Sequence, residues 1–218
     1  MIWNEYPLVH RVVVFSYYCF VAVFLQTGCG KTESPERNVV AADSEANDTE
    51  WRFELIDGRR AVPFQDPDVK AIVLVFVATD CPIANAYQPT ISHINREYSD
   101  RGIEFFLVHP NREITTAEAE AHASVFHIDV PIVLDTQLDI ARSVGAEVTP
   151  QAVVIQRNME APVYRGAIDN QYAGYGKKRP VADKHYLVEA IESVLAGEPV
   201  DIQETKSVGC FIFFDEIQ

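Results

Sequence analysis

Cys81 is the residue of this 218-residue chain that is best placed for chemistry. It follows the continuously apolar segment 71–78, and apolar residues with helical spacing begin just after it, at Ala84. A thiol between a buried strand and a helix faces the free N–H groups and the positive dipole end of that helix, which favour the thiolate. Pro82 suits the first helical turn because it lacks an N–H group. We therefore expect Cys81 to be a thiolate nucleophile that solvent can reach.

Several residues near Cys81 in sequence, or expected near it in space, belong to the same candidate site. Thr79, Asp80 and Asn85 flank the thiol. An unpaired Asp80 carboxylate would raise the pKa of the thiol, although an exposed turn residue is an equal interpretation. Thr149-Pro150 directly precedes another strand, and a cis peptide bond there would hold the backbone of Thr149 open beside the thiolate.

Cys210 lies in the tail 206–218, beyond the last predicted helix. The segment 211–214 that follows it is too apolar to be left in water, so we expect the tail to pack back on the domain. It could then bring Cys210 to Cys81 as a resolving thiol or as a second ligand of a shared metal ion. A buried inert cysteine is the alternative, because pairing requires α-carbons within about 7 Å.

The N-terminal segment predicts export. The apolar run 12–25 is short for a membrane span, which needs about 20 residues. Cys29 follows this run after three further residues, and the sequence then turns polar, which resembles a bacterial lipoprotein signal with lipidation at Cys29. An ordinary secretory signal or a short uncleaved anchor are the alternatives. We expect a signal peptide over 1–28, an acidic tether over 29–50, and a membrane-anchored protein facing the periplasm or the cell exterior.

The composition restricts the function class. The 18 basic and 32 acidic residues give a net charge of −14, which excludes a nucleic-acid binder that works through a basic surface. Hydrophobic residues make up 48% of the chain, enough for a proper core. The four cysteines form no C-x-x-C pair and no zinc knuckle, so each has to be interpreted on its own.

The order of expected strands and helices predicts one α/β domain over residues 51–205, with a mixed sheet, helices on both faces and an opening hairpin. A helix capped by Thr115 or Thr116 is expected to bury Ala117, Ala121, Val125 and Ile128. His93, His122, His127 and His185 are expected to be solvated or capping, whereas His109 ends a strand at the edge where open sheets place ligands. The loop 164–179 is interpreted as solvated, or as closing over the site or meeting a partner. The expected strands are 51–56, 61–64, 71–78, 103–108, 131–134, 152–156 and 163–168, and the expected helices start near 84, 115, 136 and 187.

The order strand, Cys81, helix, then Val148-Thr149-Pro150 and two final strands resembles the thioredoxin and redoxin superfamily over most of 51–197. The resemblance implies a thioredoxin-like three-layer sandwich of the alkyl hydroperoxide reductase and thiol-specific antioxidant type. It also implies a thiol oxidoreductase without a cofactor, in which the Cys81 thiolate attacks disulfides or peroxides and Cys210 or an external thiol resolves the product. The implied partners are a redox protein, a small thiol or a peroxide.

The chain departs from each subfamily at a diagnostic position. Ala84 stands where dithiol oxidoreductases carry their second cysteine, and Leu74 and Ala78 replace the peroxidase proline and hydroxyl residue. Asn85 stands where copper-delivering assembly factors carry their second cysteine. The alternative function is therefore a non-catalytic copper(I) carrier or assembly factor that uses Cys81, Cys210 and His109 as ligands. A scaffold that keeps the fold without turnover is a third possibility.

Overall fold

The computed structural model describes residues 51–214 of the chain. The predicted signal peptide, the tether and the lipidation site at Cys29 lie outside these residues. Within the part that is described, no helix is long and apolar enough to cross a membrane.

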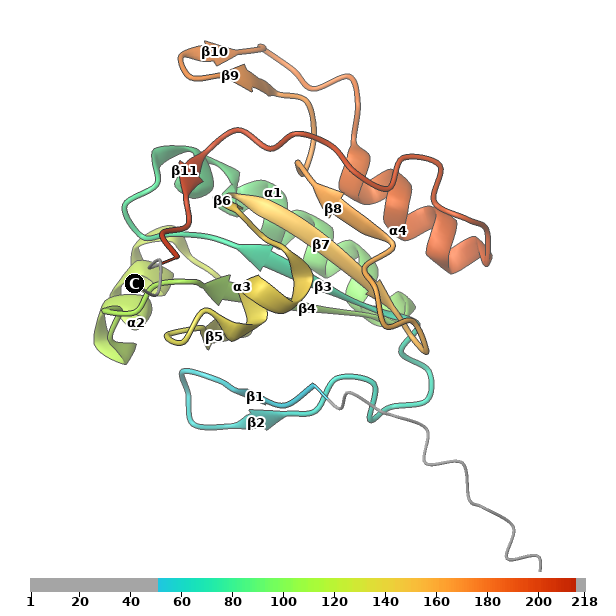
Figure 1. Cartoon of the computed structure of the whole chain (residues 1–218), viewed down its shortest axis with the longest axis horizontal. Coiled ribbons are helices and arrows are strands. Elements are labelled where there is room, and N and C mark those ends of the chain that lie inside the picture. The colour runs from blue at the N-terminus through green and yellow to red at the C-terminus, as the bar shows by residue number, and fades with distance from the viewer. Residues whose placement is uncertain (1–50, 215–218) are drawn as a thin grey trace, which may run out of the picture. The chain divides into compact units, whose positions relative to one another are not determined.

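A five-stranded mixed sheet forms the centre of the domain, in the order β5-β4-β3-β7-β8 (Figure 1). The central strand β3 (Ala71–Phe76) pairs in parallel with β4 (Ile103–His109), which pairs in parallel with β5 (Ile132–Leu134). On the other side, β7 (Gln151–Gln156) is antiparallel to β3, and β8 (Tyr164–Gly166) is antiparallel to β7. Every residue of β3 is buried, because both faces of the sheet are covered.

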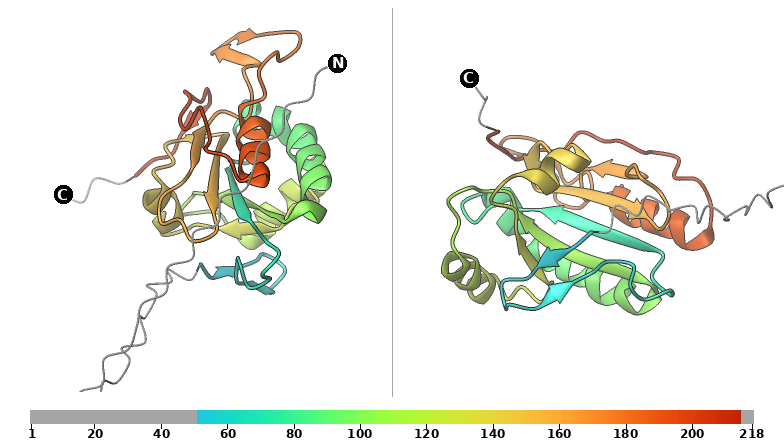
Figure 2. Two further views of the ribbon diagram at one scale, coloured as in Figure 1. Left: turned by 90° about the vertical axis from the view of Figure 1, so that its right-hand side faces the viewer. Right: turned by 60° about the horizontal axis from the view of Figure 1, so that its bottom comes forward.

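Two layers cover the sheet, as predicted. The helices α1 (Pro82–Tyr98) and α4 (Tyr186–Ala196) pack on one face through a continuous apolar cluster. The opposite face is covered by the hairpin of β1 (Phe53–Glu54) and β2 (Arg60–Ala61) and by α3 (Asp139–Val144), as Figure 2 shows. A short 3₁₀ helix η1 (Ser99–Arg101) ends at Gly102, whose positive φ turns the chain into β4.

The helix α3 begins later than predicted, at Asp139 instead of near residue 136. The buried Asp135 side chain accepts hydrogen bonds from the backbone N–H groups of Ile140, at 3.2 Å, and Ala141, at 2.8 Å. Those N–H groups have no partner inside the helix, so a carboxylate fixes where the helix starts. The opening hairpin is likewise shorter than expected, with two residues in each strand.

The predicted buried face of helix α2 (Thr116–Phe126) was wrong. Val125 is 69% exposed, and Ala117 and Ala121 are exposed too. The buried residues are Ala119 and His122. An alanine side chain has little apolar area to bury, so the alanine-rich pattern left the orientation of the helix to its contacts, and these bury a histidine.

Four short strands were not predicted. The strands β9 (Tyr172–Gly174) and β10 (Lys177–Lys178) make a hairpin from the long loop after β8. The strand β6 (Val148–Thr149) pairs with β11 (Cys210–Phe211) of the tail. In Figure 1 the tail returns from the end of α4 across the top of the domain to reach β6.

Candidate active site at Cys81 and Cys210

Cys81 is the N-cap of helix α1. Its backbone is extended, with φ −86° and ψ 108°, and its sulfur accepts a hydrogen bond from the N–H of Ala84 at 3.5 Å. Pro82 occupies the first helical position, as predicted. The sulfur therefore lies against the open amide end of the helix, where negative charge is favoured.

The loop around Thr149 is the second part of the site. The peptide bond between Thr149 and Pro150 is cis, as the sequence suggested. The thiol of Cys81 donates a hydrogen bond to the carbonyl oxygen of Thr149 at 3.0 Å. Cys81 and Thr149, which are 68 positions apart in the sequence, thus meet at the Cys81 sulfur.

The tail supplies the third part. The strand β11 lies antiparallel to β6, with Cys210 opposite Thr149 and Phe211 opposite Val148. The backbone N–H of Ile212 extends this pairing by donating to the carbonyl of Glu147 at 2.8 Å. Cys81 and Cys210 thus meet at the same residue, Thr149, and each thiol shifts the pKa of the other.

Gly209 makes this close approach possible. A Cβ atom at Gly209 would lie 1.8 Å from the carbonyl oxygen of Thr149, which is far closer than any real contact. The opposing atom belongs to the backbone and cannot rotate away. Glycine is therefore the residue that lets the tail dock at the cis-proline loop.

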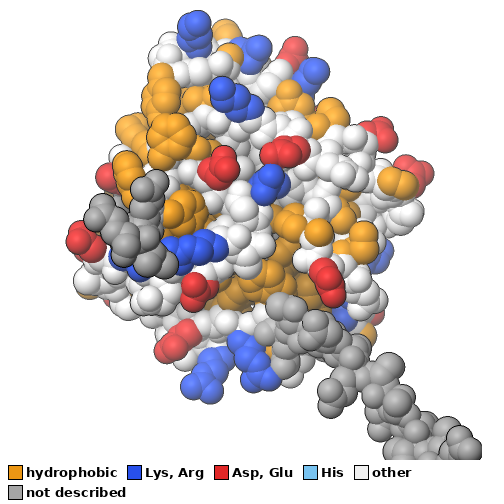
Figure 3. Space-filling model, in the orientation of Figure 1, with side chains coloured by type: hydrophobic (Ala, Val, Ile, Leu, Met, Phe, Trp, Pro, Cys, Tyr) orange, Lys and Arg blue, Asp and Glu red, His pale blue; other side chains and the backbone are white. Residues whose placement is uncertain are grey.

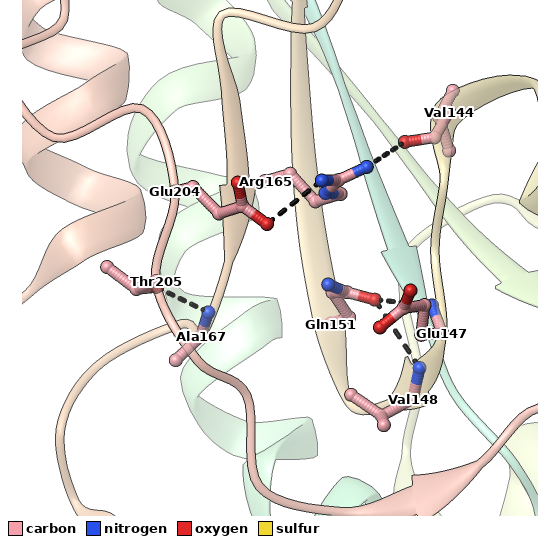
Figure 4. A network of polar contacts seen from close by, with 8 residues as sticks. All are labelled: Val144, Glu147, Val148, Gln151, Arg165, Ala167, Glu204 and Thr205. Carbon is pink, nitrogen blue, oxygen red and sulfur yellow. Dashed lines mark hydrogen bonds and ion pairs between the residues drawn. The ribbon is translucent and has the colours of Figure 1, made fainter.

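The tail is held upstream by a polar network, drawn in Figure 4. The Thr205 hydroxyl accepts from the N–H of Ala167 at 2.9 Å and contacts the Tyr164 hydroxyl at 2.7 Å. Arg165 pairs with Glu204 at 2.9 Å. Closer to Cys210, the hydroxyl of Tyr175 donates to the carbonyl of Gly209. The path of the tail is therefore fixed on both sides of the docking point.

The two thiols have opposite electrostatic environments. Burial acts to raise the pKa of Cys81, but hydrogen bonds from the Ala84 N–H and from the side chains of Cys210 and Thr149 outweigh it, so the pKa lies below its ordinary value. The pKa of Cys210 is raised to about 11, mainly by burial. The hydrogen bond with Cys81, the negative charge of Cys81 and that of Asp80 act in the same direction. Cys81 is thus the more acidic thiol of the pair, and Cys210 is the less acidic one.

The expectation that solvent reaches Cys81 was wrong for this arrangement. Cys81 is 0% exposed, whereas Cys210 is partly exposed. Cys81 belongs to the apolar core cluster, and the tail docks on the neighbouring strand β6. The return of the tail to the domain was predicted from its apolar residues, but its docking position was not. The sulfur still faces the proline loop, as the redox hypothesis requires.

The flanking residues hold the loop before the helix. The Asn85 side chain donates to the carbonyl of Thr79 at 2.9 Å, and its oxygen bonds to Nε2 of His122 at 2.8 Å. Asp80 is exposed, and its charge raises the pKa of Cys210, not that of Cys81. Asn85 thus joins the active-site loop to helix α2.

His122 is buried, contrary to the expectation of a solvated or capping residue, and it packs edge-on against His109 with ring centroids 5.3 Å apart. Burial, with a smaller contribution from the charge of His122, lowers the pKa of His109 to about 4. The spacing of three and four residues from Ala119 through His122 to Phe126 is a signal for this buried face that the sequence analysis missed. Within residues 51–214 no group of three or more His, Cys, Asp or Glu side chains is placed to hold a metal ion.

An open cavity of about 1010 Å³ lies between the β9–β10 hairpin and the tail. Its lining includes Tyr172, Tyr175, Ser207, Gly209 and Phe211, so it borders the residues next to Cys210. Figure 3 shows apolar side chains gathered on the side of the molecule where the hairpin and the tail lie. The loop 164–179 is therefore an ordered hairpin that touches the tail.

Comparison with known proteins places this site in a family. Residues 46–160 match the family described as Redoxin. The chain belongs to the Redoxin family. It is 23% identical over 137 residues to the thiol-disulfide oxidoreductase ResA of Halalkalibacterium halodurans, which covers 62% of this chain and 75% of that protein.

Solved structures show the same fold. A conserved protein of Geobacillus kaustophilus superposes with a TM-score of 0.63 at 22% identity, covering 78% of this chain and 92% of that one. A protein described as thiol:disulfide interchange protein DsbE of Chlorobium tepidum superposes with a TM-score of 0.51 at 18% identity, covering 67% and 93%. These likenesses confirm the thioredoxin-like α/β fold.

Proposed function

We propose that this protein is a thiol-disulfide oxidoreductase whose redox couple consists of Cys81 and Cys210. The observation that carries the proposal is the pairing of β11 with β6, which sets Cys210 opposite Thr149, the residue that the Cys81 thiol contacts. Ala84 leaves the helix without the usual second cysteine. The tail supplies a thiol in its place, from the opposite end of the domain.

The chemistry requires no group beyond the two thiols. When a partner disulfide is reduced, the two cysteines give up two electrons and two protons and join as a disulfide. In the opposite direction the protein disulfide oxidises a partner dithiol. Stabilisation of the Cys81 thiolate favours the reduced protein, so the couple should be a comparatively strong oxidant.

Disulfides and dithiols are favoured over peroxides as substrates. The positions of the peroxidase proline and hydroxyl residue hold Leu74 and Ala78. The name of the ResA relative supports disulfide chemistry as well. The copper(I) alternative has no support in the comparisons with known proteins and is not carried forward.

The test is turnover with oxidised glutathione and, separately, with hydrogen peroxide. We expect Cys81→Ser and Cys210→Ser each to lose at least about 100-fold with the disulfide, because either change removes one sulfur of the couple. Cys19→Ser, in the predicted signal segment, is the matched control. Mild oxidation of the full chain should also lower its mass by two hydrogen atoms and link the Cys81 and Cys210 peptides. Equal rates for wild type and Cys81→Ser would contradict the proposal.

We also propose that the domain works outside the cytoplasm, tethered through Cys29. Support comes from the apolar run 12–25, the cysteine that follows it and the polar segment 31–50. Labelling with radioactive palmitate should mark the wild type and not Cys29→Ser. Label retained by the variant would contradict lipidation at Cys29.

A further inference from the structure

The two sulfur atoms of the proposed couple differ in access. Cys81 is 0% exposed, enclosed by helix α1, the Thr149 carbonyl and the tail. Cys210 is partly exposed, and Phe211, the next residue on β11, is 69% exposed. The open cavity between the hairpin and the tail borders this same strand.

The tail cannot shift aside by a small adjustment. Gly209 is in contact with the backbone of Thr149, Tyr175 holds the Gly209 carbonyl, and Thr205 holds the tail upstream. A molecule that approaches Cys81 from solvent must first undo this docking. A molecule that approaches Cys210 need not.

Thiol-disulfide exchange depends on which sulfur can be approached. The attacking thiolate enters on the side of the attacked sulfur that faces away from the leaving sulfur, and access decides between the two ends. Cys210 is partly exposed on the short strand β11, so an attacking thiolate can reach its sulfur. Cys81 is 0% exposed, as is Ala84 on the helix that follows it, so the Cys81 sulfur offers no such approach.

We propose, building on the proposed redox couple, that partner thiols exchange with the protein disulfide at Cys210 and that Cys81 is the leaving sulfur. This reverses the roles expected from the sequence, in which Cys81 meets the substrate and Cys210 resolves. The tail cysteine is the point of contact with the partner, and the cysteine at the helix N-terminus is the internal electron acceptor.

The steps balance as follows. A partner thiolate forms a bond with the Cys210 sulfur, the bond between Cys210 and Cys81 breaks, and its electron pair leaves on Cys81 as thiolate. A second partner thiolate then attacks the partner sulfur of this mixed disulfide. Cys210 is released and takes a proton from solvent, the partner is oxidised to a disulfide, and the protein has gained two electrons.

The electrostatics of the site favour the same direction. The thiol with the lower pKa is the better leaving group. Hydrogen bonds from the Ala84 N–H and neighbouring side chains, which outweigh burial, hold the pKa of Cys81 below its ordinary value, whereas that of Cys210 is raised to about 11. Departure of Cys81 thus places the charge where the helix end already stabilises it.

The experiment uses the oxidised full chain, with the loss of two hydrogen masses verified first. It is treated with excess reduced glutathione, quenched in acid, alkylated with N-ethylmaleimide and mapped by peptide mass. We expect glutathione on the Cys210 peptide at least about tenfold more often than on the Cys81 peptide, which should carry the alkyl group. Glutathione on Cys81, or an even distribution, would overturn the inference.

A tail-loosening variant gives a second readout that does not depend on trapping an adduct. Tyr175→Phe removes the hydroxyl that holds the Gly209 carbonyl. If Cys81 were attacked, this loosening would speed reduction of the disulfide by glutathione several-fold over wild type. Attack at Cys210 predicts no such acceleration. Tyr172→Phe, on β9 of the same hairpin, is the matched control.

The outcomes separate this inference from the proposed function. If the oxidised chain never loses the two hydrogen masses, the Cys81–Cys210 couple itself is wrong. If the disulfide forms but reduction proceeds through Cys81, the couple stands and only the assignment of the attacked sulfur fails.

Discussion

At the scale of single residues, the site depends on the missing side chain of Gly209. The tail can dock at Thr149, beside Cys81, because the α-hydrogen of Gly209, and not a methyl group, faces the carbonyl of Thr149. The sulfur of Cys81 was placed by capping rules, which any reader of the sequence can apply. Gly209 can also be read in the sequence, but the sequence does not show that the Thr149 carbonyl oxygen lies opposite it.

Gly209→Ala is expected to slow formation of the Cys81–Cys210 disulfide at least about tenfold, because the new Cβ would lie 1.8 Å from the Thr149 oxygen. The measurement is the rate at which free thiols disappear under oxidised glutathione. Gly174→Ala is the matched control, since its nearest neighbour would be a flexible lysine carbon at 3.8 Å. A wild-type rate in Gly209→Ala would show that the docked register is not needed.

At the scale of elements, the strand β8 and the tail segment beside it set the register of β11. The backbone N–H of Arg165 donates to Gln203, and that of Thr205 donates back to Arg165. The Thr205 hydroxyl adds contacts to Ala167 and Tyr164. These bonds tie the tail to the sheet before it crosses to β6.

Thr205→Val should lower the free energy of unfolding by about 1–2 kcal/mol, because it leaves the Ala167 N–H without its acceptor while keeping the side-chain shape. Urea unfolding followed by circular dichroism measures the change. Thr205→Ser keeps the hydroxyl and should lose clearly less. If the serine and valine variants are equally destabilised, the methyl contact and not the hydrogen bond holds the tail.

At the scale of the whole molecule, the buried histidines make stability depend on pH. His109 is 1% exposed and keeps a pKa of about 4, because burial and the nearby His122 oppose its charge. In the unfolded chain its pKa is about 6.5. Between these values the unfolded chain binds a proton that the folded chain does not, so stability falls as the pH drops from about 6.5 to 4. Burial lowers the pKa of His122 as well, which adds a loss of the same sign.

His109→Phe should remove part of this acid sensitivity. The full contribution of His109 is on the order of 3 kcal/mol, from a shift of about 2.5 units at about 1.4 kcal/mol each. Unfolding free energies of wild type and variant at pH 7 and at pH 4 give the difference. The exposed His93→Gln is the control and should keep the wild-type slope. An unchanged slope in His109→Phe would show that the buried ring is not the source.

Much of the fold follows from local rules. The apolar run of β3, the spacing along helix α1 and the glycine ends of α3 and α4 were predicted near their observed positions. The cis bond at Thr149 was also anticipated. Each depends on neighbouring residues and on periodicity, so the sequence contains the information directly.

The sequence by itself determined the fold class and the position of Cys81 at the start of helix α1, because capping and burial patterns are local. The tertiary structure alone decided that Cys81 is fully buried, that the tail pairs with β6 so that Cys210 lies opposite Thr149, and that helix α2 buries His122. These outcomes depend on contacts between distant segments, whose register is set by backbone pairing and steric fit. Neither spacing nor composition specifies such contacts.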